Sequence, residues 1–320
     1  MNETRLAPVA LFIFNRPQLT AQVYERIRAA RPSRLLIVAD GPRADRHDEA
    51  DLCMATRIIV TSPDWPCELQ TNFAKQNLGC RARMSSGIDW VFEQCPEAII
   101  LEDDCLPGPS FLPFCTEMLT RFRDDDRIMH VSGDNFQDGN RRGTASYFFS
   151  RYSLSWGWAS WRRAWKHYDV NISTWPQAFC AKWLESIMDD PEEVRYWDSI
   201  FDRQYLGKID TWDYQWLYAC WRHGGLAIQP NVNLVSNIGA GPDATHFKDG
   251  HTTIGIPTGE LERLVHPEVV IRDRAADQYT FKEHIAMLQS SQPGFVLKLK
   301  QRLGLRARIK SMLPRSRRYQ

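Results

Sequence analysis

Short apolar runs alternate with helix-forming segments over the first part of the chain, and this alternation limits the fold more than any other feature. Three runs read as buried strands, and a fourth is more polar: PVALFIF (8–14), SRLLIVADGP (33–42), AIILEDD (98–104) and CELQTNFAKQNLGC (67–80). Residues 18–30 and 81–95 carry apolar side chains at helical spacing. Alternating strands and helices predict an α/β fold with a mostly parallel sheet flanked by helices.

The length of 320 residues is enough for one large α/β domain with an appendage. We predict a main domain over 1–260, with halves at 1–130 and 131–260, and a C-terminal extension over 261–320. The 40 Lys and Arg nearly balance the 39 Asp and Glu, so the overall charge favours no particular partner.

Polar side chains follow three of the predicted strands. Asn15 and Arg16 follow the first, Asp40 follows the second, and an acidic run follows the strand at 98–104. Parallel α/β sheets bind ligands in loops beyond the carboxyl ends of their strands. We therefore predict that these segments converge on one site.

The acidic run is Glu102, Asp103 and Asp104, three neighbouring carboxylates that repel one another. Carboxylates at strand ends often hold Mg²⁺ or Mn²⁺ between the protein and the phosphates of a substrate. The alternative is that they are solvated turn acids, one of which caps the next helix. Neither GxxxxGK[ST] nor GxGxxG occurs, which removes the commonest phosphate-binding loops.

Four stretches, FIFNRP, VADG, ILEDDCLPGPSFLPF and WDYQW, occur in this order. In them the chain resembles glycosyltransferases of the GT-A fold, namely nucleotide-sugar transferases related to family 2 and to N-acetylglucosaminyltransferase I. The resemblance implies a Rossmann-like GT-A catalytic domain over 1–260, whose first half binds a nucleotide sugar and whose second half binds the acceptor. It also implies Mn²⁺- or Mg²⁺-dependent, inverting transfer from a UDP-sugar, with UDP-GlcNAc as one candidate, to a glycan or glycolipid in surface polysaccharide synthesis.

The resemblance gives the polar residues individual roles. Asp104 is the direct metal ligand, and Glu102 and Asp103 hold ribose or metal-bound water. Arg16 meets the base or a phosphate, and Asp40 accepts a hydrogen bond from uracil. Taken singly, Arg16 also reads as a charge at a helix start and Asp40 as a turn residue.

Three further residues are assigned to the donor. Asn15 lies beside Arg16, while Arg81 and Arg83 lie near the start of the predicted helix at 81–95. These arginines either contact the diphosphate or stabilise the fold.

The segment TWDYQW (211–216) provides a candidate catalytic base. Inverting transfer needs a carboxylate that takes a proton from the acceptor hydroxyl. Asp213 is flanked by Trp212 and Trp216, and aromatic neighbours make a carboxylate more basic. The resemblance also puts the base in this element; the alternative is an acid at a helix N-terminus, favoured by the helix dipole.

A tryptophan-rich stretch, SWGWASWRRAW (155–165), reads mainly as core. We expect one or two of its tryptophans to wall the acceptor pocket. Trp156 and Trp158 are the candidates, together with Trp212 and Trp216.

Residues 237–260 are rich in Gly, Thr, Pro and Asp, which suits a lid over the bound donor. His246 either completes the metal shell or is an ordinary surface or core residue. Residues 295–320 hold nine Lys or Arg and no acid, so they either lie on an anionic membrane surface or form a solvated tail.

We expect a cytoplasmic protein, with the tail as a reason to place it at the inner face of the membrane. The eight Cys form no CxxC pair, and we find neither a leader nor an apolar span of about 18 residues. A nucleic-acid partner is not expected. Two rival functions remain: a sugar-phosphate nucleotidyltransferase and a non-catalytic carbohydrate-binding protein.

Overall fold

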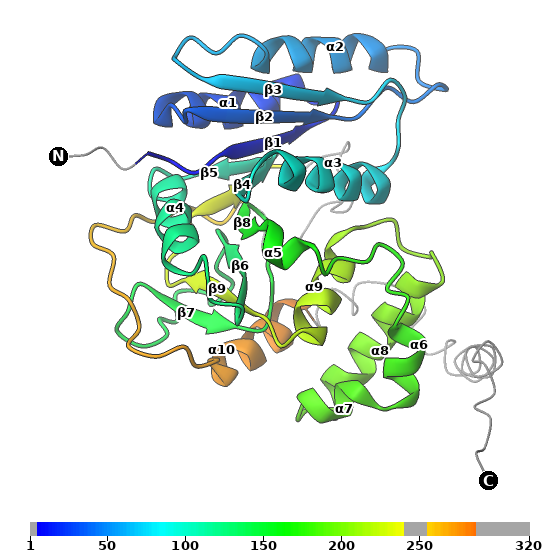
Figure 1. Ribbon diagram of the computed structural model, residues 1–320, viewed down its shortest axis with the longest axis vertical. Helices are drawn as coiled ribbons and strands as arrows, with labels where there is room; N and C mark the ends of the chain where they lie inside the picture. Colours follow the sequence, from blue (N-terminus) through cyan, green and yellow to red (C-terminus); the bar gives the residue numbers. More distant parts are fainter. Residues whose placement is uncertain (1–4, 240–254, 286–320) are drawn as a thin grey trace.

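The computed structural model describes residues 5–239 and 255–285. An eight-stranded mixed sheet forms its centre, in the strand order β3-β2-β1-β4-β8-β6-β9-β7 (Figure 1). The strands are β1 Val9–Ile13, β2 Arg34–Ala39, β3 Glu68–Phe73, β4 Glu97–Glu102, β6 Ile128–Ser132, β7 Tyr147–Ser150, β8 Trp158–Trp161 and β9 Leu226–Pro230. β5 (Cys105–Pro107) and β10 (Val235–Asn237) form a separate antiparallel pair.

Six strands of the large sheet run in one direction, and β8 and β7 run against them. The predicted α/β fold with a mostly parallel sheet is therefore confirmed. Because β1, β2, β4 and β6 share a direction, the loops after them leave the same edge of the sheet. This shared edge positions the candidate site.

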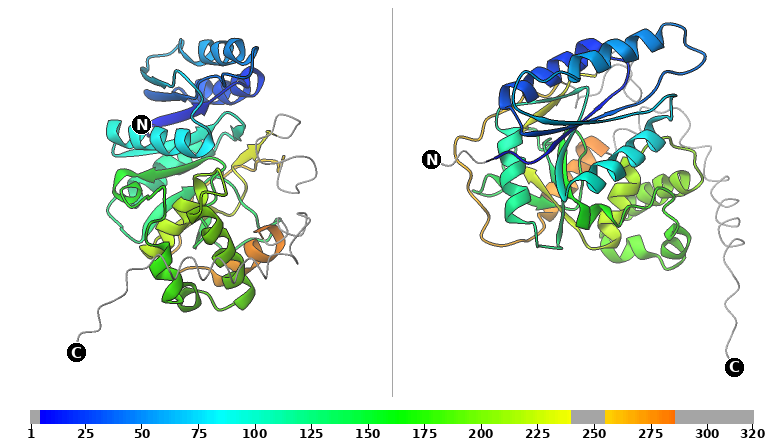
Figure 2. Two further views of the ribbon diagram at one scale, coloured as in Figure 1. Left: turned by 90° about the vertical axis from the view of Figure 1, so that its right-hand side faces the viewer. Right: turned by 45° about the horizontal axis from the view of Figure 1, so that its top comes forward.

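Helices cover both faces of the sheet (Figures 1 and 2). α1, α2 and α4 contribute side chains to the core on one face, while α3, α5 and α9 do so on the other. Their bounds are α1 Pro17–Ala30, α2 Glu49–Val60, α3 Cys80–Gln94, α4 Phe111–Arg121, α5 Arg162–Trp165 and α9 Asp213–Arg222. β1 shows why both faces need cover, because Val9 and Leu11 enter one core and Ala10 and Phe12 the other.

A third cluster of buried side chains joins α9 to α6 (Trp175–Cys180), α7 (Trp183–Ile187) and α8 (Pro191–Tyr205). Most of its large members are aromatic, which accounts for the tryptophans in the middle of the chain. No helix among the described residues is both long and apolar enough to cross a bilayer. All eight cysteines are free thiols.

Residues 255–285 pack on the same sheet. Leu261 and Leu264 pack against the core that α1, α2 and α4 cover. The backbone N–H of Ser146 donates to the carbonyl of Val265, and Arg272 forms an isolated parallel β-bridge with Phe149 of β7. α10 (Arg274–Tyr279) and the π-helix η1 (Thr280–Ile285) follow. Packing is thus continuous across residue 260, where the sequence suggested the start of an extension.

Gly87 of α3 lies where this helix approaches the sheet most closely. A Cβ at Gly87 would lie 2.6 Å from Cε1 of Phe12 and 2.7 Å from Cγ1 of Val38. These atoms belong to β1 and β2, the strands that carry Arg16 and Asp40 at their ends. Helix and strands can therefore approach this closely only because residue 87 has no side chain.

We predict that Gly87→Ala destabilises the protein by about 1–3 kcal/mol, because overpacking outweighs the better helix propensity of alanine. Urea unfolding followed by circular dichroism measures this change. Ser86→Ala, at the exposed neighbour on the same helix, is the matched control and should change stability by less than about 0.5 kcal/mol. Equal stability of the Gly87→Ala and wild-type proteins would contradict the close packing.

Candidate functional site

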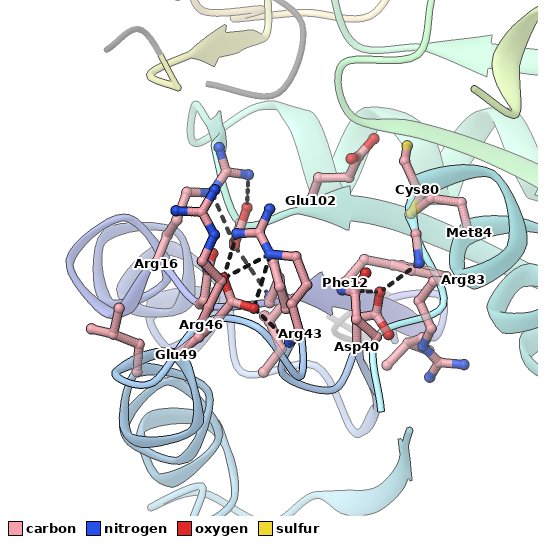
Figure 3. Close-up of a pocket in the computed structure, with 18 of the residues that line it drawn as sticks. Phe12, Arg16, Asp40, Arg43, Arg46, Glu49, Cys80, Arg83, Met84 and Glu102 are labelled. Carbon is pink, nitrogen blue, oxygen red and sulfur yellow. Dashed lines mark hydrogen bonds and ion pairs between the residues drawn. The ribbon is translucent and has the colours of Figure 1, made fainter. Parts of the chain in front are cut away.

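A cavity of about 890 Å³ opens at the carboxyl ends of β1, β2 and β4 (Figure 3). Most of the residues that the sequence assigned to donor binding line it: Asn15, Arg16, Asp40, Arg83, Glu102 and Asp103. They come from segments far apart in the chain, and the shared strand direction brings them together. The predicted convergence of these segments is observed.

Arg16 is the cation that meets the acidic cluster. Its guanidinium pairs with Asp103 and, through Nη1, with Oδ2 of Asp104 at 3.0 Å. The backbone N–H of Phe14 also donates to Asp103 at 3.4 Å. Arg16 was predicted to meet the base or a phosphate; in the structure its first role is to hold two carboxylates in place.

The three acids differ in what satisfies them. Only 3% of the Asp103 side chain is exposed, and it is paired with Arg16, whereas 17% of the Asp104 side chain remains exposed. The carboxyl group of Glu102 forms no hydrogen bond or ion pair with the described residues. Burial, followed by the charges of Asp104 and Asp103, raises the pKa of Glu102 to about 8. Burial also raises the pKa of Asp103 to about 6, against the opposing charge of Arg16.

With Glu102 protonated, the charges of Asp103 and Asp104 exceed that of Arg16 by one, and loss of the Glu102 proton raises this excess to two. A divalent cation has the complementary charge, and oxygen is its preferred ligand. Among residues 5–239 and 255–285, no three His, Cys, Asp or Glu are arranged to hold a metal by themselves. The cluster therefore fits a cation of the Mg²⁺ or Mn²⁺ type, which needs only one or two carboxylates when phosphates complete its shell.

Asp40 is occupied by hydrogen bonds within its own loop. Its carboxylate accepts hydrogen bonds from the backbone N–H groups of Gly41 (2.8 Å), Leu78 (2.9 Å) and Gly79 (3.2 Å), and from Nδ2 of Asn77 (2.9 Å). These donors occupy both oxygens. Asp40 thus fixes the loop that leads into α3, which argues against the predicted hydrogen bond to uracil.

The two arginines near the start of α3 separate in the structure. Arg83 lines the cavity, and its Nη2 donates to the carbonyl and the side-chain oxygen of Asn72 at 2.6 and 3.0 Å. Arg81 donates instead to the carbonyl of Val170 and to Asn171, and it is not among the lining residues of this cavity. The alternative that Arg81 stabilises the fold is the one its contacts favour.

The loop between β2 and α2 supplies basic residues that were not predicted. Arg43, Arg46 and His47 line the cavity, and Figure 3 shows Arg43 and Arg46 near Arg16. Buried Glu49 orders this loop, because it pairs with Arg43 and accepts from Nδ2 of Asn15 at 2.9 Å. The rule that ligand loops follow strand ends applies equally to DGPRADRH, where three basic side chains occur within five residues.

Asp213 lies at the same edge of the sheet as the acidic cluster. α9 precedes β9, which runs in the direction of β4, so the helix begins at the edge where β4 ends. Asp213 is the first residue of α9 and accepts a hydrogen bond from Oγ1 of Thr211. Its negative charge adds, after larger effects of burial, Asp104 and Asp103, to the raised pKa of Glu102.

The tryptophans proposed for the acceptor lie mostly in the core. Trp158, Trp212 and Trp216 are 1%, 3% and 1% exposed, and Trp158 stacks on Trp212 with ring centroids 5.3 Å apart. Nε1 of Trp216 donates to Nδ1 of His130 at 3.0 Å. This burial corrects the prediction, since it leaves these three rings no exposed face for an acceptor. Trp156 is half-buried and keeps that role as a proposal.

Two predictions lie outside the described residues. His246, proposed as a metal ligand, falls within 240–254, and the basic tail falls within 286–320.

Comparison with known proteins yields only distant similarities. No protein-family model and no curated protein matches the chain. A solved mannosyltransferase, PcManGT from Pyrobaculum calidifontis in complex with GDP-Man and Mn²⁺, is 14% identical over 50% of this chain and 46% of its own, with a TM-score of 0.34. This chain thus spans less than half of that protein.

Two nucleotide-handling enzymes are similar to a comparable degree. A UDP-glucose pyrophosphorylase complexed with UDP-glucose is 9% identical over 50% of this chain and 78% of its own (TM-score 0.29). A cytidylyltransferase from Leptospira borgpetersenii is 11% identical over 50% and 61% (TM-score 0.30). Similarities this distant carry no function to the chain, so its own residues must supply the argument.

The raised pKa of Glu102 predicts how stability depends on pH. In the folded protein Glu102 keeps its proton up to a pKa of about 8, whereas in the unfolded chain it loses the proton near its ordinary value of 4.5. Between these values the folded state binds more protons, so the stability of the wild type falls as pH rises. Glu102→Gln removes this loss, and its Tm relative to the wild type should increase by about 2 °C or more between pH 5 and pH 8.

Differential scanning calorimetry in EDTA measures this difference. Glu93→Gln, at an exposed position of α3, is the control and should track the wild type at every pH. A Glu102→Gln difference that stays constant across the range would show that Glu102 ionises normally in the folded protein.

Proposed function

We propose that the protein is a metal-dependent, inverting glycosyltransferase that moves a sugar from a UDP-sugar, with UDP-GlcNAc as the first candidate, to a glycan or glycolipid. The observation that carries the proposal is the acidic cluster, in which three carboxyl groups face the single guanidinium of Arg16, beside a cavity that Arg43 and Arg46 also line. A sugar nucleotide brought there with a divalent cation satisfies both sides: the cation meets the acids, and the diphosphate meets the arginines.

Asp104 is the residue we assign as the direct ligand of a Mg²⁺ or Mn²⁺ ion. It is the more exposed of the two acids that Arg16 holds. The neighbouring carboxyl group of Glu102, on which the charge of Asp104 acts, is assigned to a water of the ion. When bound, the ion neutralises charge that develops on the departing diphosphate. The ion pairs of Arg16 hold the side chains of Asp103 and Asp104 in place whether or not the ion is present.

The basic loop between β2 and α2 provides the diphosphate contacts. Arg43 is tethered by Glu49 yet keeps 44% of its side chain exposed, and Arg46 forms no ion pair with the described residues. Planar guanidinium groups bind phosphate oxygens in a bidentate manner. We assign Arg46 and Arg43 to the diphosphate, and the part of the cavity near Asn77 and Val38 to the nucleoside.

Asp213 is the proposed general base. Its carboxylate takes the proton of an acceptor hydroxyl while that oxygen bonds to the anomeric carbon and the bond from this carbon to the diphosphate oxygen breaks. Attack opposite the leaving group inverts the anomeric configuration. The half-buried position of Asp213 at the start of α9, at the edge where Glu102 lies, suits this role.

Both rival functions are less well supported. A nucleotidyltransferase usually carries a glycine-rich basic loop after its first strand, but here only three residues separate β1 from α1, and none is glycine. A lectin built on the tryptophan-rich half is less well supported because Trp158, Trp212 and Trp216 are buried, and because sugar binding alone gives no role to the acidic cluster.

Incubation of the full chain with UDP- and GDP-sugars and Mn²⁺ tests the reaction class. We expect one UDP-sugar to be hydrolysed slowly to UDP and free sugar, and EDTA to stop the reaction. Formation of a nucleotide sugar and pyrophosphate from a nucleoside triphosphate and a sugar phosphate would instead assign nucleotidyl transfer.

Asp213→Asn tests the base. Turnover of that UDP-sugar should fall by about 10²–10⁴-fold because no group accepts the proton. The Kd for UDP, measured calorimetrically with Mn²⁺, should stay within about twofold, because Asp213 makes no contact with the nucleotide. Glu192→Gln, at an exposed acid in the first turn of α8, is the matched control and should lose less than about twofold. Near wild-type turnover of Asp213→Asn would remove it from the role.

A further inference from the structure

Asp134, immediately beyond β6, is a buried carboxylate with almost no partner. It is 1% exposed, and its Oδ1 has no hydrogen-bond partner among the described residues. Its Oδ2 accepts from the backbone N–H of Trp156, at 3.4 Å, and the backbone N–H of Asp134 itself also stabilises the carboxylate. Burying a polar group without hydrogen bonds costs about 1–3 kcal/mol, so such a group calls for a ligand or another explanation.

Two more unpartnered polar atoms lie on the same face of the sheet. Ser132 is the cross-strand neighbour of Trp158, and neither Oγ of Ser132 nor Nε1 of Trp158 has a partner among the described residues. His130 and Ser132 lie on one face of β6, and Asp134 follows two residues beyond Ser132, where it contacts the backbone N–H of Trp156. Unsatisfied polar atoms thus occur on three residues at or beside the end of β6.

This group lies at the edge of the sheet that carries the proposed transfer site. β6 and β4 run in the same direction with β8 between them, so their ends are roughly 10 Å apart, two strand spacings. Trp212 stacks on Trp158, which places the first turn of α9, and with it Asp213, over the start of β8. Asp134 thus lies beyond Asp213 as seen from the nucleotide cavity.

Half-buried aromatic rings accompany Asp134. Phe136 and Trp156 pack edge to face, with ring centroids 5.3 Å apart, and both keep part of their surface exposed. Residues 153–156, which include Trp156, are all half-buried and lie outside any helix or strand. A hydrogen-bonding group beside exposed aromatic faces matches the surface of a pyranose, which has hydroxyls at its rim and C–H groups on its faces.

We propose that Asp134, Phe136 and Trp156 form a sugar subsite in which the Asp134 carboxyl hydrogen-bonds to a pyranose hydroxyl. The proposal rests on the proposed function for the class of ligand, and the hydroxyl belongs either to the acceptor or to the transferred sugar. Segment 153–156 shifts to admit the ring, and the unpartnered Oδ1 then gains its hydrogen bond.

The ionisation of Asp134 agrees with this assignment. Burial raises the pKa of Asp134 to about 8, and the hydrogen bonds it accepts only partly oppose this rise. At neutral pH the side chain is then a carboxylic acid, which donates one hydrogen bond and accepts others. A hydroxyl group has the same dual capacity.

Asp134→Asn tests the subsite with defined probes. The methyl β-glycosides of glucose, galactose, mannose and N-acetylglucosamine are titrated into the full chain by ligand-observed NMR, with and without UDP and Mn²⁺. For an acceptor hydroxyl, we expect at least one glycoside to bind the wild type and to bind Asp134→Asn at least about tenfold more weakly, with UDP binding unchanged. For a hydroxyl of the transferred sugar, the KM of the hydrolysed UDP-sugar rises by a similar factor instead.

Three comparisons make the test decisive. Asp138→Asn removes a nearby carboxylate that is already hydrogen-bonded by Tyr279 and His284, and it should leave sugar binding unchanged. Phe136→Leu should weaken binding of the same glycoside while the protein stays folded. This variant covers the case in which Asp134→Asn is unstable. Unchanged glycoside affinity and unchanged donor KM in both Asp134→Asn and Phe136→Leu would overturn the proposal.

The two proposals fail in distinguishable ways. Glycoside binding measured without UDP does not require the nucleotide cavity, so a wild type that binds a glycoside but not UDP contradicts only the proposed transfer reaction. A wild type that binds UDP with Mn²⁺ while Asp134→Asn behaves as the wild type contradicts only the subsite.

Discussion

Electrostatic repulsion at the end of β4 determines how the rest of the site is arranged. Three consecutive acids, Glu102, Asp103 and Asp104, occur where the chain leaves the large sheet and enters β5. Arg16 holds two of them from the neighbouring strand end, and the third keeps its proton to unusually high pH because burial and its neighbours disfavour its charge. The protein alone therefore satisfies the cluster only in part, and the proposed cation with its bound phosphate would complete it.

The parallel direction of the strands turns this local feature into a site. Loops after β1, β2, β4 and β6 leave one edge, so acids, arginines and aromatic rings from segments far apart in sequence lie along one line. The cavity proposed to bind the nucleotide lies over β1, β2 and β4, and α9 begins with Asp213 at the same edge. Asp134 and its aromatic neighbours follow at β6. This order matches the order of a donor nucleotide, a reacting bond and a sugar.

The sequence predicts the first half of the fold well, because its strands are apolar on both faces and its helices show clear periodicity. The same patterns, read with the rule that ligand loops follow strand ends, pointed to six candidate donor-binding residues that line one cavity in the structure. The roles of Arg16 and Asp40 were harder to predict, because a sequence does not show that a carboxylate is already occupied by its own loop, as Asp40 is by Leu78 and Gly79.

The second half is harder for a related reason. Trp158 and Trp216 belong to short elements that pack against each other across long separations in the chain, so aromatic composition alone could not separate core from ligand-binding rings. No sequence motif or spacing pattern singles out Asp134. Its importance depends on which hydrogen bonds are missing around it, and only coordinates show that.

The most direct test of the account is the position of a manganese ion. Crystals grown with UDP and Mn²⁺ should give an anomalous difference peak about 2.1 Å from a carboxylate oxygen of Asp104, with the diphosphate on the far side of the ion. UDP bound elsewhere, or in this cavity without an anomalous peak beside residues 102–104, would contradict the claim that a divalent cation completes this cluster.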